Sequence, residues 1–428
     1  MRVSSSPLWT LADSYKFIFR FSKFQFPQPY SISQFSRHRQ FTTYYVTPQT
    51  NPVGPEISSV PRLRVPLLNA PTHLGHFSSR VNRHDNEDRY SVSVLTLPAM
   101  SSLTPRALKA ATHPERQVFF YSVFDGHGGS ECSEFLAQSL ATYVENADLN
   151  SIDALERNWK ENIGGYWTRW RGHLEKFRSR MSKDSDLLLR IPVSFLQADY
   201  DFTMAERPSG STCTSVLLYS SIPDVPYWSG SPSRLLVAHV GDTRCILSDR
   251  NGVAHALTSA HHLSSPIESA RLRRYAASFF TDSFGEERFG NVENTRSFGD
   301  RSMKRLGVTA EPDLTEYTLG SPTAEDGFGG EEPFMVLISD GVSKFASDQE
   351  VVDIVTSTGY RSGYARGTPQ DAAREVVQFA EDVGGDDNAT CIVVRLSGWG
   401  KWTRPVDRTG DLREYRLREA LDKVARRQ

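Results

Sequence analysis

Runs of apolar residues that end at an acidic residue followed by glycine recur along this chain. Residues 119–124 are mostly apolar, aromatic or β-branched, which predicts a buried strand, and the run ends at the sequence Asp-Gly-His-Gly-Gly at 125–129. Apolar residues then recur at the spacing of a helix, at Cys132, Phe135, Leu136, Leu140 and Tyr143. Residues 333–338 form a second run of this kind and end at Asp340-Gly341. The pattern predicts acidic side chains at strand ends, the first of them where a strand gives way to a helix.

The remaining pattern predicts two groups of strands with helices between them. Further strands are expected at 88–95, 213–219, 235–240, 245–247 and 389–396. Helices are expected at 267–275, at 348–357 and from 368 onward, and the polar segment 150–195 is also predicted to be mainly helical. Because strands and helices do not alternate regularly, we expect an α+β fold with largely antiparallel sheets covered by helices.

The composition is that of an ordinary globular protein. Of the 428 residues, 38% are apolar and 23% are charged, and the net charge of −2 argues against nucleic acid as the main partner. No run of eighteen apolar residues occurs, so no membrane span is predicted. The four cysteines lie far apart without a CxxC pair and are interpreted as reduced core thiols.

The first fifty residues differ from the rest in charge. They contain a single acid, Asp13, against six basic residues, Arg2, Lys16, Arg20, Lys23, Arg37 and Arg39. A segment rich in Arg and Ser and poor in acids is typical of a mitochondrial transit peptide, and the alternative is a basic tail without a targeting role. We therefore expect a presequence and linker at 1–57, one folded domain at 58–397 and a basic tail at 398–428.

Acidic residues at predicted strand ends point to a shared metal site. There are five of them: Glu87, Asp88, Asp125, Asp340 and Asp387. One Asp-Gly alone would be interpreted as a turn that caps a helix, but clustered carboxylates raise one another's pKa unless cations lie between them. Oxygen ligands without a His/Cys set favour Mg²⁺ or Mn²⁺. Two such ions about 3.5–4 Å apart can activate water and bind a phosphoryl group. The absence of a Walker lysine motif disfavours nucleotide hydrolysis.

Seven motifs occur in the order of the metal-dependent protein phosphatase 2C family, which the chain resembles over roughly residues 60–397. They are Arg83-x-x-x-Glu87-Asp88, Val123-Phe124-Asp125-Gly126-His127-Gly128-Gly129, Gly210-Ser211-Thr212, Val240-Gly241-Asp242-Thr243-Arg244, Thr295-Arg296-Ser297-Phe298-Gly299-Asp300, Asp340-Gly341 and Asp387-Asn388. The resemblance implies a β-sandwich of two packed antiparallel sheets flanked by α-helices, with the metals at one end. The N-terminal segment makes the chain most similar to the fungal mitochondrial members.

The resemblance also implies which residues hold the metals. Two Mg²⁺ or Mn²⁺ ions would be bound by Glu87, Asp125, the Gly126 carbonyl, Asp340 and Asp387. Asp125 would bridge both ions.

Three further residues receive catalytic roles from the resemblance. Asp88 would orient metal-bound water, and Arg83 would hold the substrate phosphate as a bidentate fork. His127 would act as the general acid for the leaving serine or threonine oxygen. A hydroxide that bridges the metals would attack phosphorus directly, with no phosphoenzyme intermediate.

The chain departs from the family at two positions. Where many members have Asp after Leu-Thr, this chain has Ala260, and where the family often continues Asp-Gly-x-Trp-Asp, it has Lys344. The two missing acids help to bind a third metal in relatives. We therefore expect the two-metal core to persist and the third site to be absent or differently filled, although Lys344 could instead contact an acidic substrate.

Other polar and aromatic residues are interpreted as structural. The adjacent His261 and His262 are expected to be solvated, and Asp242 with Arg244 is expected to be a structural turn and its ion pair. Three residues are expected to organise the loop beneath the site, namely Arg296, Gly299 and Asp300. Three tryptophans are expected to contribute to core packing, namely Trp159, Trp167 and Trp170. The basic tail is expected to form a helix from residue 412 whose basic face is solvated.

The sequence thus predicts a protein serine/threonine phosphatase, a monomer acting on phosphoproteins in the mitochondrial matrix. Resemblance to mitochondrial members suggests the phosphorylated pyruvate dehydrogenase complex as a substrate. One alternative is an inactive pseudophosphatase that serves as a docking module, and another is a metal phosphohydrolase for small molecules. The charged loop at 276–300 favours protein substrates over metabolites.

Overall fold

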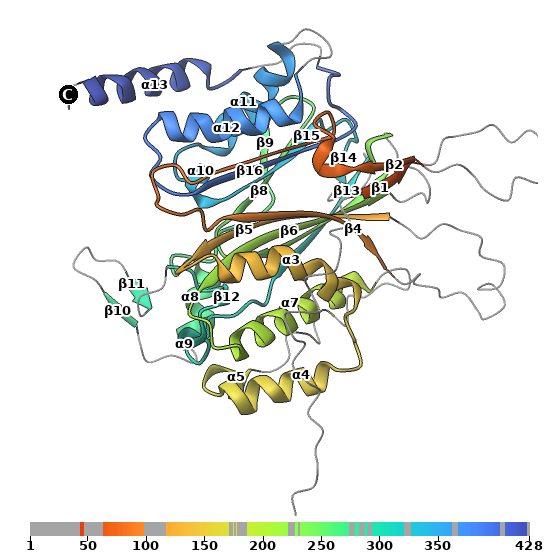
Figure 1. The fold of residues 1–428 in the computed structure, drawn as a ribbon, viewed down its shortest axis with the longest axis vertical. Helices are drawn as coiled ribbons and strands as arrows, with labels where there is room; N and C mark the ends of the chain where they lie inside the picture. The colour runs from red at the N-terminus through yellow and green to blue at the C-terminus, as the bar shows by residue number, and fades with distance from the viewer. Residues whose placement is uncertain are drawn as a thin grey trace, which may run out of the picture. The chain divides into compact units, whose positions relative to one another are not determined.

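Two β-sheets lie face to face in the computed structural model of this protein, with helices on both outer faces (Figure 1). The structure describes residues 43–46, 63–97, 117–170, 174, 177, 186–220, 227–229, 232–273, 279–281, 287–289, 293–320, 327–361, 367–402 and 407–425. The predicted presequence lies outside the described residues except for 43–46. The residues between 274 and 292 are described only in part.

Within the described residues, the larger sheet has seven strands and the smaller has five. In spatial order the larger contains β14 (Gly327–Phe328), β13 (Asp313–Leu319), β7 (Ser233–Val240), β6 (Gly210–Ser220), β5 (Gln117–His127) and β4 (Arg89–Thr96), with β12 (Phe298–Gly299) paired to β6. The smaller contains β3 (Leu74–Ser79), β16 (Ala389–Arg395), β15 (Phe334–Ile338), β8 (Arg244–Ser248) and β9 (Ala254–Ala256). Except for the parallel pair β13–β14, the described pairings within these sheets are antiparallel, as predicted. Two further pairs are separate, β1 (Thr43–Val46) with β2 (Leu63–Pro66) and β10 (Phe279–Thr281) with β11 (Glu287–Phe289).

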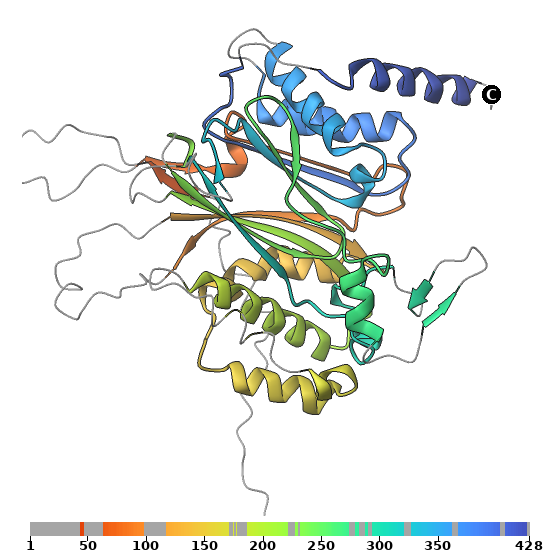
Figure 2. The ribbon, with the colours of Figure 1, turned by 180° about the vertical axis from the view of Figure 1, so that it is seen from behind.

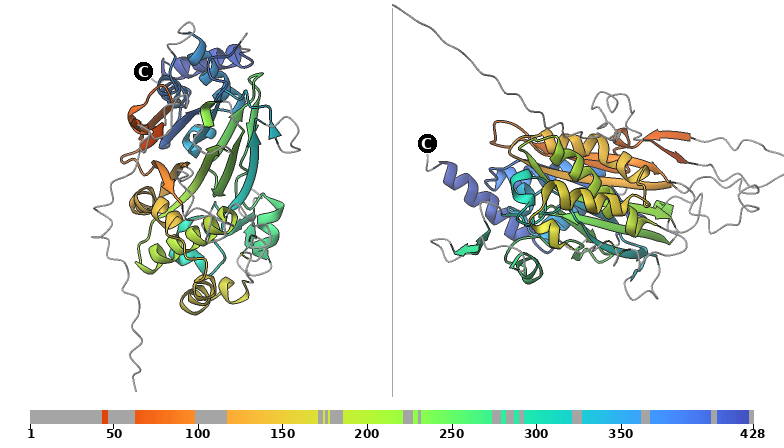
Figure 3. Two further views of the ribbon diagram at one scale, coloured as in Figure 1. Left: turned by 90° about the vertical axis from the view of Figure 1, so that its right-hand side faces the viewer. Right: turned by 90° about the horizontal axis from the view of Figure 1, so that it is seen from below.

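Helices cover the outer face of each sheet, so the layers run helix, sheet, sheet, helix (Figure 3). The larger sheet is covered by α3 (Glu131–Glu145) and α7 (Leu187–Met204), with α4 (Ile152–Asn158) and α5 (Tyr166–Arg169) outside them. The smaller sheet is covered by α11 (Asp348–Arg361) and α12 (Pro369–Asp382). Shorter helices are α8 (Pro266–Arg273), α9 (Arg301–Lys304) and α10 (Asp340–Ser343), and α8 lies beside the end of the sandwich where β5 ends (Figure 2). Among the described helices, none combines the length and hydropathy that crossing a membrane requires.

Alternation along β5 explains the layers. Phe119, Tyr121 and Val123 point into the core between the two sheets, where they join Met335 and other residues of the smaller sheet. Phe120 and Phe124 point the other way and join a second core with residues of α3 and α7. Because successive side chains of a strand face opposite sides, an almost continuous apolar run is required where both faces are covered. A third core lies between the smaller sheet and α11 and α12.

The central strand extends further than the sequence predicts. The run was expected to end at Asp125, but β5 continues through His127 because residues 125–127 stay in antiparallel register with residues 210–212 of β6. Helix α3 then begins at Glu131. The strand–helix order is confirmed, and the acid lies within the last ladder pairs of the strand rather than after it.

The tryptophans of the 150–195 segment pack as expected. Trp159 lies in a π-helical turn, Trp159–Ile163, and its ring stacks on Trp167 with centroids 4.1 Å apart. Trp167 in turn packs edge-on against Trp170, with ring centroids 5.1 Å apart. All three are buried in one cluster with residues of α4 and α7. The packing interpretation is therefore confirmed for these three residues.

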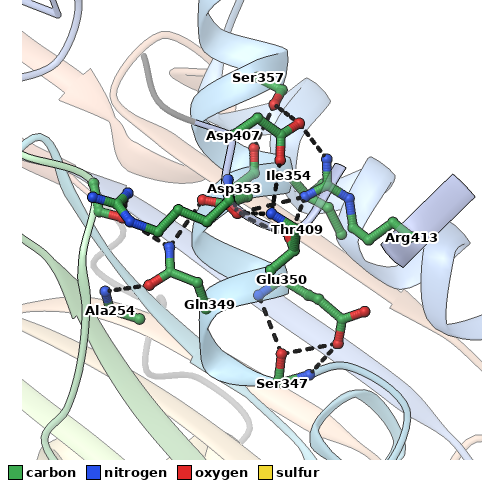
Figure 4. Close-up of polar contacts among 12 residues, drawn as sticks. Ala254, Ser347, Gln349, Glu350, Asp353, Ile354, Ser357, Asp407, Thr409 and Arg413 are labelled. Carbon is green, nitrogen blue, oxygen red and sulfur yellow. Dashed lines mark hydrogen bonds and ion pairs between the residues drawn. The ribbon is translucent and has the colours of Figure 1, made fainter. Parts of the chain in front are cut away.

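The C-terminal segment is bound to α11 rather than solvated along its whole length (Figure 4). Thr409 donates hydrogen bonds from its backbone N–H and its hydroxyl to Asp353 of α11, and Arg413 pairs with Asp407 at 2.7 Å. Arg416 of α13 (Gly410–Ala425) pairs with Glu350 at 2.6 Å. The expectation of a solvated helix face is wrong for Arg413 and Arg416, because Asp407 binds Arg413 and Glu350 of α11 binds Arg416.

Candidate metal centre

Strand ends from both sheets meet at one edge of the sandwich and line a cavity of about 600 Å³. Asp125 lies two residues before the end of β5, Asp242 follows β7, Asp340 follows β15, and Asp387 precedes β16. The predicted site residues that line this cavity are Arg83, Glu87, Asp125, Gly126, His127, Asp340 and Asp387. The fold therefore brings together residues far apart in the sequence, such as Arg83 and Asp387.

Three carboxylates that line the cavity lie close together. Asp125, Asp242 and Asp340 each offer an oxygen atom, and these atoms lie within 4.8 Å of one another. Burial, together with the charges of Asp88 and Asp340, raises the pKa of Asp125 well above its ordinary value. Burial and the charge of Asp242 likewise raise the pKa of Asp340. Such carboxylates can all be ionised only if cations lie between them.

Close backbone contacts hold this arrangement. A Cβ atom on Gly126 would lie 2.4 Å from the carbonyl oxygen of Glu87, so only glycine lets β5 approach the segment that carries Glu87 and Asp88. Gly241 has φ of +102°, a conformation that side chains disfavour, and there the chain turns to present Asp242. The glycines of the motifs thus set the backbone positions of the neighbouring acids.

Glu87 and Asp88 lie side by side in sequence but in different environments. Glu87 lines the cavity, and its Oε1 accepts a hydrogen bond from the backbone N–H of Gly129 at 2.8 Å. Asp88 is buried, and its Oδ2 accepts hydrogen bonds from the hydroxyls of Ser339 and Thr390, each at 2.7 Å. Its Oδ1 is buried with no hydrogen-bond partner among the described residues. Burial raises the pKa of Asp88 to about 7, although the two hydroxyls oppose this.

Arg83 and Asp387 form an ion pair at the rim. Arg83 Nη2 lies 3.1 Å from Asp387 Oδ1, and Arg83 Nε donates to the Asp386 carbonyl at 3.0 Å. The Arg83 side chain is 56% exposed. This leaves the guanidinium accessible to an anion that enters the cavity.

His127 is held by Asp300. The ring Nε2 lies 3.0 and 2.9 Å from the two oxygens of Asp300, which also accepts a hydrogen bond from Ser297 at 2.5 Å. Burial lowers the pKa of His127, but the hydrogen bond and charge of Asp300 outweigh it and raise the pKa above its ordinary value. Asp300 was expected only to organise the loop beneath the site, and its contact with His127 gives it a more direct position.

A buried charged network supports the turn at Gly241. The backbone N–H of Gly241 donates to His261 Nδ1 at 3.0 Å, and His261 Nε2 donates to Asp313 at 2.9 Å. Arg296 forms two ion pairs, one with Asp313 at 2.9 Å and one with Glu268 at 2.5 Å. The expectation that His261 is solvated is wrong, because its ring is buried between Gly241 and Asp313.

Asp242 also lies in a different environment from the one expected. It was expected to be a structural turn paired with Arg244, but Arg244 pairs with Asp348 at 2.5 Å. Asp242 instead lies among the cavity acids and contacts His262 at 3.3 Å. Burial raises its pKa, but the hydrogen bonds of His262 and Asn294 outweigh burial and lower it. The signal was present in the sequence, since Gly241-Asp242 ends a buried run as Asp125 and Asp340 do.

Lys344 places an ammonium group beside the acids. Its Nζ lies 2.5 Å from Asp340 Oδ2 and 3.8 Å from Asp387 Oδ2. Burial lowers the pKa of Lys344, but its hydrogen bond with Asp340 and the negative charge of Asp340 outweigh burial and raise the pKa above its ordinary value. Ala260, the other departure, does not line the cavity.

The donor set fits divalent cations that prefer oxygen. The cavity presents carboxylates of Glu87, Asp125, Asp242, Asp340 and Asp387. The clustered oxygens and the raised pKa values of Asp125 and Asp340 are what a site completed by Mg²⁺ or Mn²⁺ requires.

Comparisons with known proteins agree with this geometry. The family model described as Protein phosphatase 2C matches residues 99–389. Protein phosphatase 2C homolog 4 of Schizosaccharomyces pombe is 38% identical over 376 residues, which are 86% of this chain and 88% of that relative. The protein named "Protein phosphatase 1K, mitochondrial" of Xenopus laevis is 27% identical over 348 residues, 80% of this chain and 71% of that relative.

Solved structures support the fold. The serine-threonine phosphatase 2C from Toxoplasma gondii superposes with a TM-score of 0.50 at 17% identity and covers 75% of this chain and 94% of its own. A C. elegans sex determining protein has the same TM-score at 19% identity, with 81% of this chain and 67% of its own covered. The predicted sandwich of antiparallel sheets flanked by helices is confirmed.

Proposed function

This chain belongs to the protein phosphatase 2C family and is a metal-dependent protein serine/threonine phosphatase, and we propose that its catalytic centre is the cavity at the strand ends with two Mg²⁺ or Mn²⁺ ions. The observation that carries the proposal is the convergence of Asp125, Asp242 and Asp340 within 4.8 Å. Asp125, one of the three, would contribute to holding both ions, as the family resemblance implies. Asp340 and Asp387 would hold one ion, and Glu87 with the Gly126 carbonyl would hold the other.

Bound divalent ions would make water a strong nucleophile at neutral pH and neutralise charge on the phosphoryl group. Asp88 would offer the attacking water a hydrogen-bond acceptor, and the buried Oδ1, which has no partner among the described residues, supports this role. Arg83 lies exposed at the rim and would bind two phosphate oxygens with its planar fork.

His127 would protonate the serine or threonine oxygen as it leaves. Asp300 supports this role because its carboxylate holds the ring Nε2 from one side and favours the protonated form. The same contact fixes the ring orientation, so we assign Asp300 as the positioning residue of the general acid.

We further infer that the substrates are phosphoproteins of mitochondria. Two observations support this location: the basic, acid-poor first fifty residues and the similarity to a Xenopus relative named as mitochondrial. The phosphorylated pyruvate dehydrogenase complex is the first substrate to test. Import of the full chain into isolated mitochondria, with processing to a shorter product, is expected, and a chain that stays outside would refute the location.

Phosphate release from a phosphothreonine peptide by the full chain tests the activity. Turnover is expected with Mg²⁺ or Mn²⁺ and not with EDTA. Asp340→Asn should abolish it, because this acid contributes to the carboxylate cluster. Turnover in EDTA, or full activity in the variant, would refute the proposed centre.

A further inference from the structure

Lys344 is an unusual neighbour for carboxylates that hold metal. It lies one helical turn after Asp340, and its backbone N–H donates to the Asp340 carbonyl at 2.8 Å. Residues four apart on a helical turn face the same side, so the ammonium is directed at the Asp340 carboxylate by the local backbone. The 2.5 Å contact between Nζ and Oδ2 follows from this spacing.

The ammonium also reaches a second acid of the cavity. Asp387 has one oxygen 3.1 Å from Arg83 Nη2 and the other 3.8 Å from Lys344 Nζ. Each oxygen of Asp387 thus faces one basic side chain. Lys344 therefore already contributes one positive charge to two of the carboxylates that would hold a metal.

We propose that Lys344 is a tethered cation that competes with a divalent ion for Asp340 and Asp387, so that this chain binds metal more weakly than the same carboxylates would without the lysine. An oxygen that accepts a charged hydrogen bond at 2.5 Å has less electron density to offer an ion. The ammonium also repels a divalent ion, because the two carry charge of the same sign at short range. The inference rests on the proposed function, since it takes Asp340 and Asp387 as metal ligands.

The Lys344 side chain has room to move away from Asp340. Its side chain is 46% exposed and lines the cavity, so it can turn from Asp340 into solvent when an ion binds. Solvent at this half-exposed position weakens the repulsion. We therefore expect its removal to tighten metal binding roughly tenfold rather than by several orders of magnitude.

Calorimetric titration of the full chain with Mn²⁺ tests this. Lys344→Met and Lys344→Gln remove the charge, and each should bind Mn²⁺ roughly tenfold more tightly than the original chain. Lys344→Arg keeps the charge and should stay close to the original affinity. The matched control is Lys160→Met, because Lys160 also pairs with an acid four residues away, Glu156 at 3.5 Å, outside the cavity.

Thermal unfolding in EDTA adds a readout that does not depend on bound metal. Without the ammonium the clustered acids repel one another more, so Lys344→Met should unfold at a lower temperature than Lys344→Arg. Unchanged or weaker Mn²⁺ binding by both neutral variants would overturn the inference.

Asp340→Asn separates this failure from failure of the metal centre. If Asp340→Asn loses Mn²⁺ affinity while the neutral lysine variants bind as the original chain does, the centre stands and the competition is refuted. If Asp340→Asn binds Mn²⁺ normally, the ligand assignment itself is wrong and the inference falls with it.

Discussion

Replacement of Asp300 by Asn should slow the protonation of the leaving oxygen without removing the general acid. Asn keeps the size of the side chain and tolerates the left-handed backbone at this position, where φ is +50°. A hydrogen bond to a charged partner contributes about 1.5–3 kcal/mol. Because the His127 side chain is 43% exposed, solvent screening places the loss at the lower end of that range. At 1.36 kcal/mol for each factor of ten, kcat should fall roughly tenfold.

Two substrates with different leaving groups make the assay specific. A phosphoserine or phosphothreonine peptide releases a poor leaving group and needs the proton, so the variant should be slow with it. p-Nitrophenyl phosphate releases a stabilised phenolate, so Asp300→Asn should hardly change its kcat. Asp249→Asn is the matched control, because Asp249 contacts His255 at 3.2 Å away from the cavity. Equal losses with both substrates, or a peptide kcat within twofold of the original, would refute the positioning role.

Three further substitutions test the residues around the site. Asp242→Asn should weaken Mn²⁺ binding roughly tenfold in a calorimetric titration, because it removes one negative charge from the cluster. Lys304→Met should lower the free energy of unfolding by about 3–5 kcal/mol in a urea titration, since it leaves the fully buried Asp199 without its partner at 2.7 Å. Glu268→Gln should cost less, about 1.5–3 kcal/mol near neutral pH, because it removes the carboxylate that pairs with Arg271 and Arg296 while Arg296 keeps Asp313. Burial raises the pKa of Glu268, but the charges of two arginines lower it below the ordinary value, so its stabilisation is present above about pH 4.3 and is lost as the pH falls further. Urea titrations should therefore show a smaller difference between Glu268→Gln and the original chain at low pH, and a constant difference would contradict this reasoning.

Local patterns predicted much of this fold. The strand expected at 235–240 appears as β7 (Ser233–Val240), and Thr368 forms the predicted start of α12 through a capping box with Asp371. These features depend on nearby residues, so the sequence carries their signal directly. The end of β5 could not be predicted in the same way, because the pairing of residues 125–127 with β6 depends on a strand more than eighty positions away.

The candidate site shows the same limit. The sequence indicates Asp125 and Asp340 because each ends an apolar run, whereas Asp242 ends an apolar run too but also fits a structural turn. What distinguishes a turn residue from a member of the cluster is the approach of the two sheets, which no local pattern contains. The burial of His261 is not visible in the local sequence for the same reason, since it depends on Asp313 of β13.

The most direct test of the central claim is a crystal structure of the full chain grown with Mn²⁺ and measured for anomalous scattering. Two anomalous peaks about 3.5–4 Å apart are expected in the cavity, with Asp125 between them. Asp340 and Asp387 should contact one peak, and Glu87 should lie near the other. A single peak, or a pair of peaks outside this cavity, would contradict the two-metal centre.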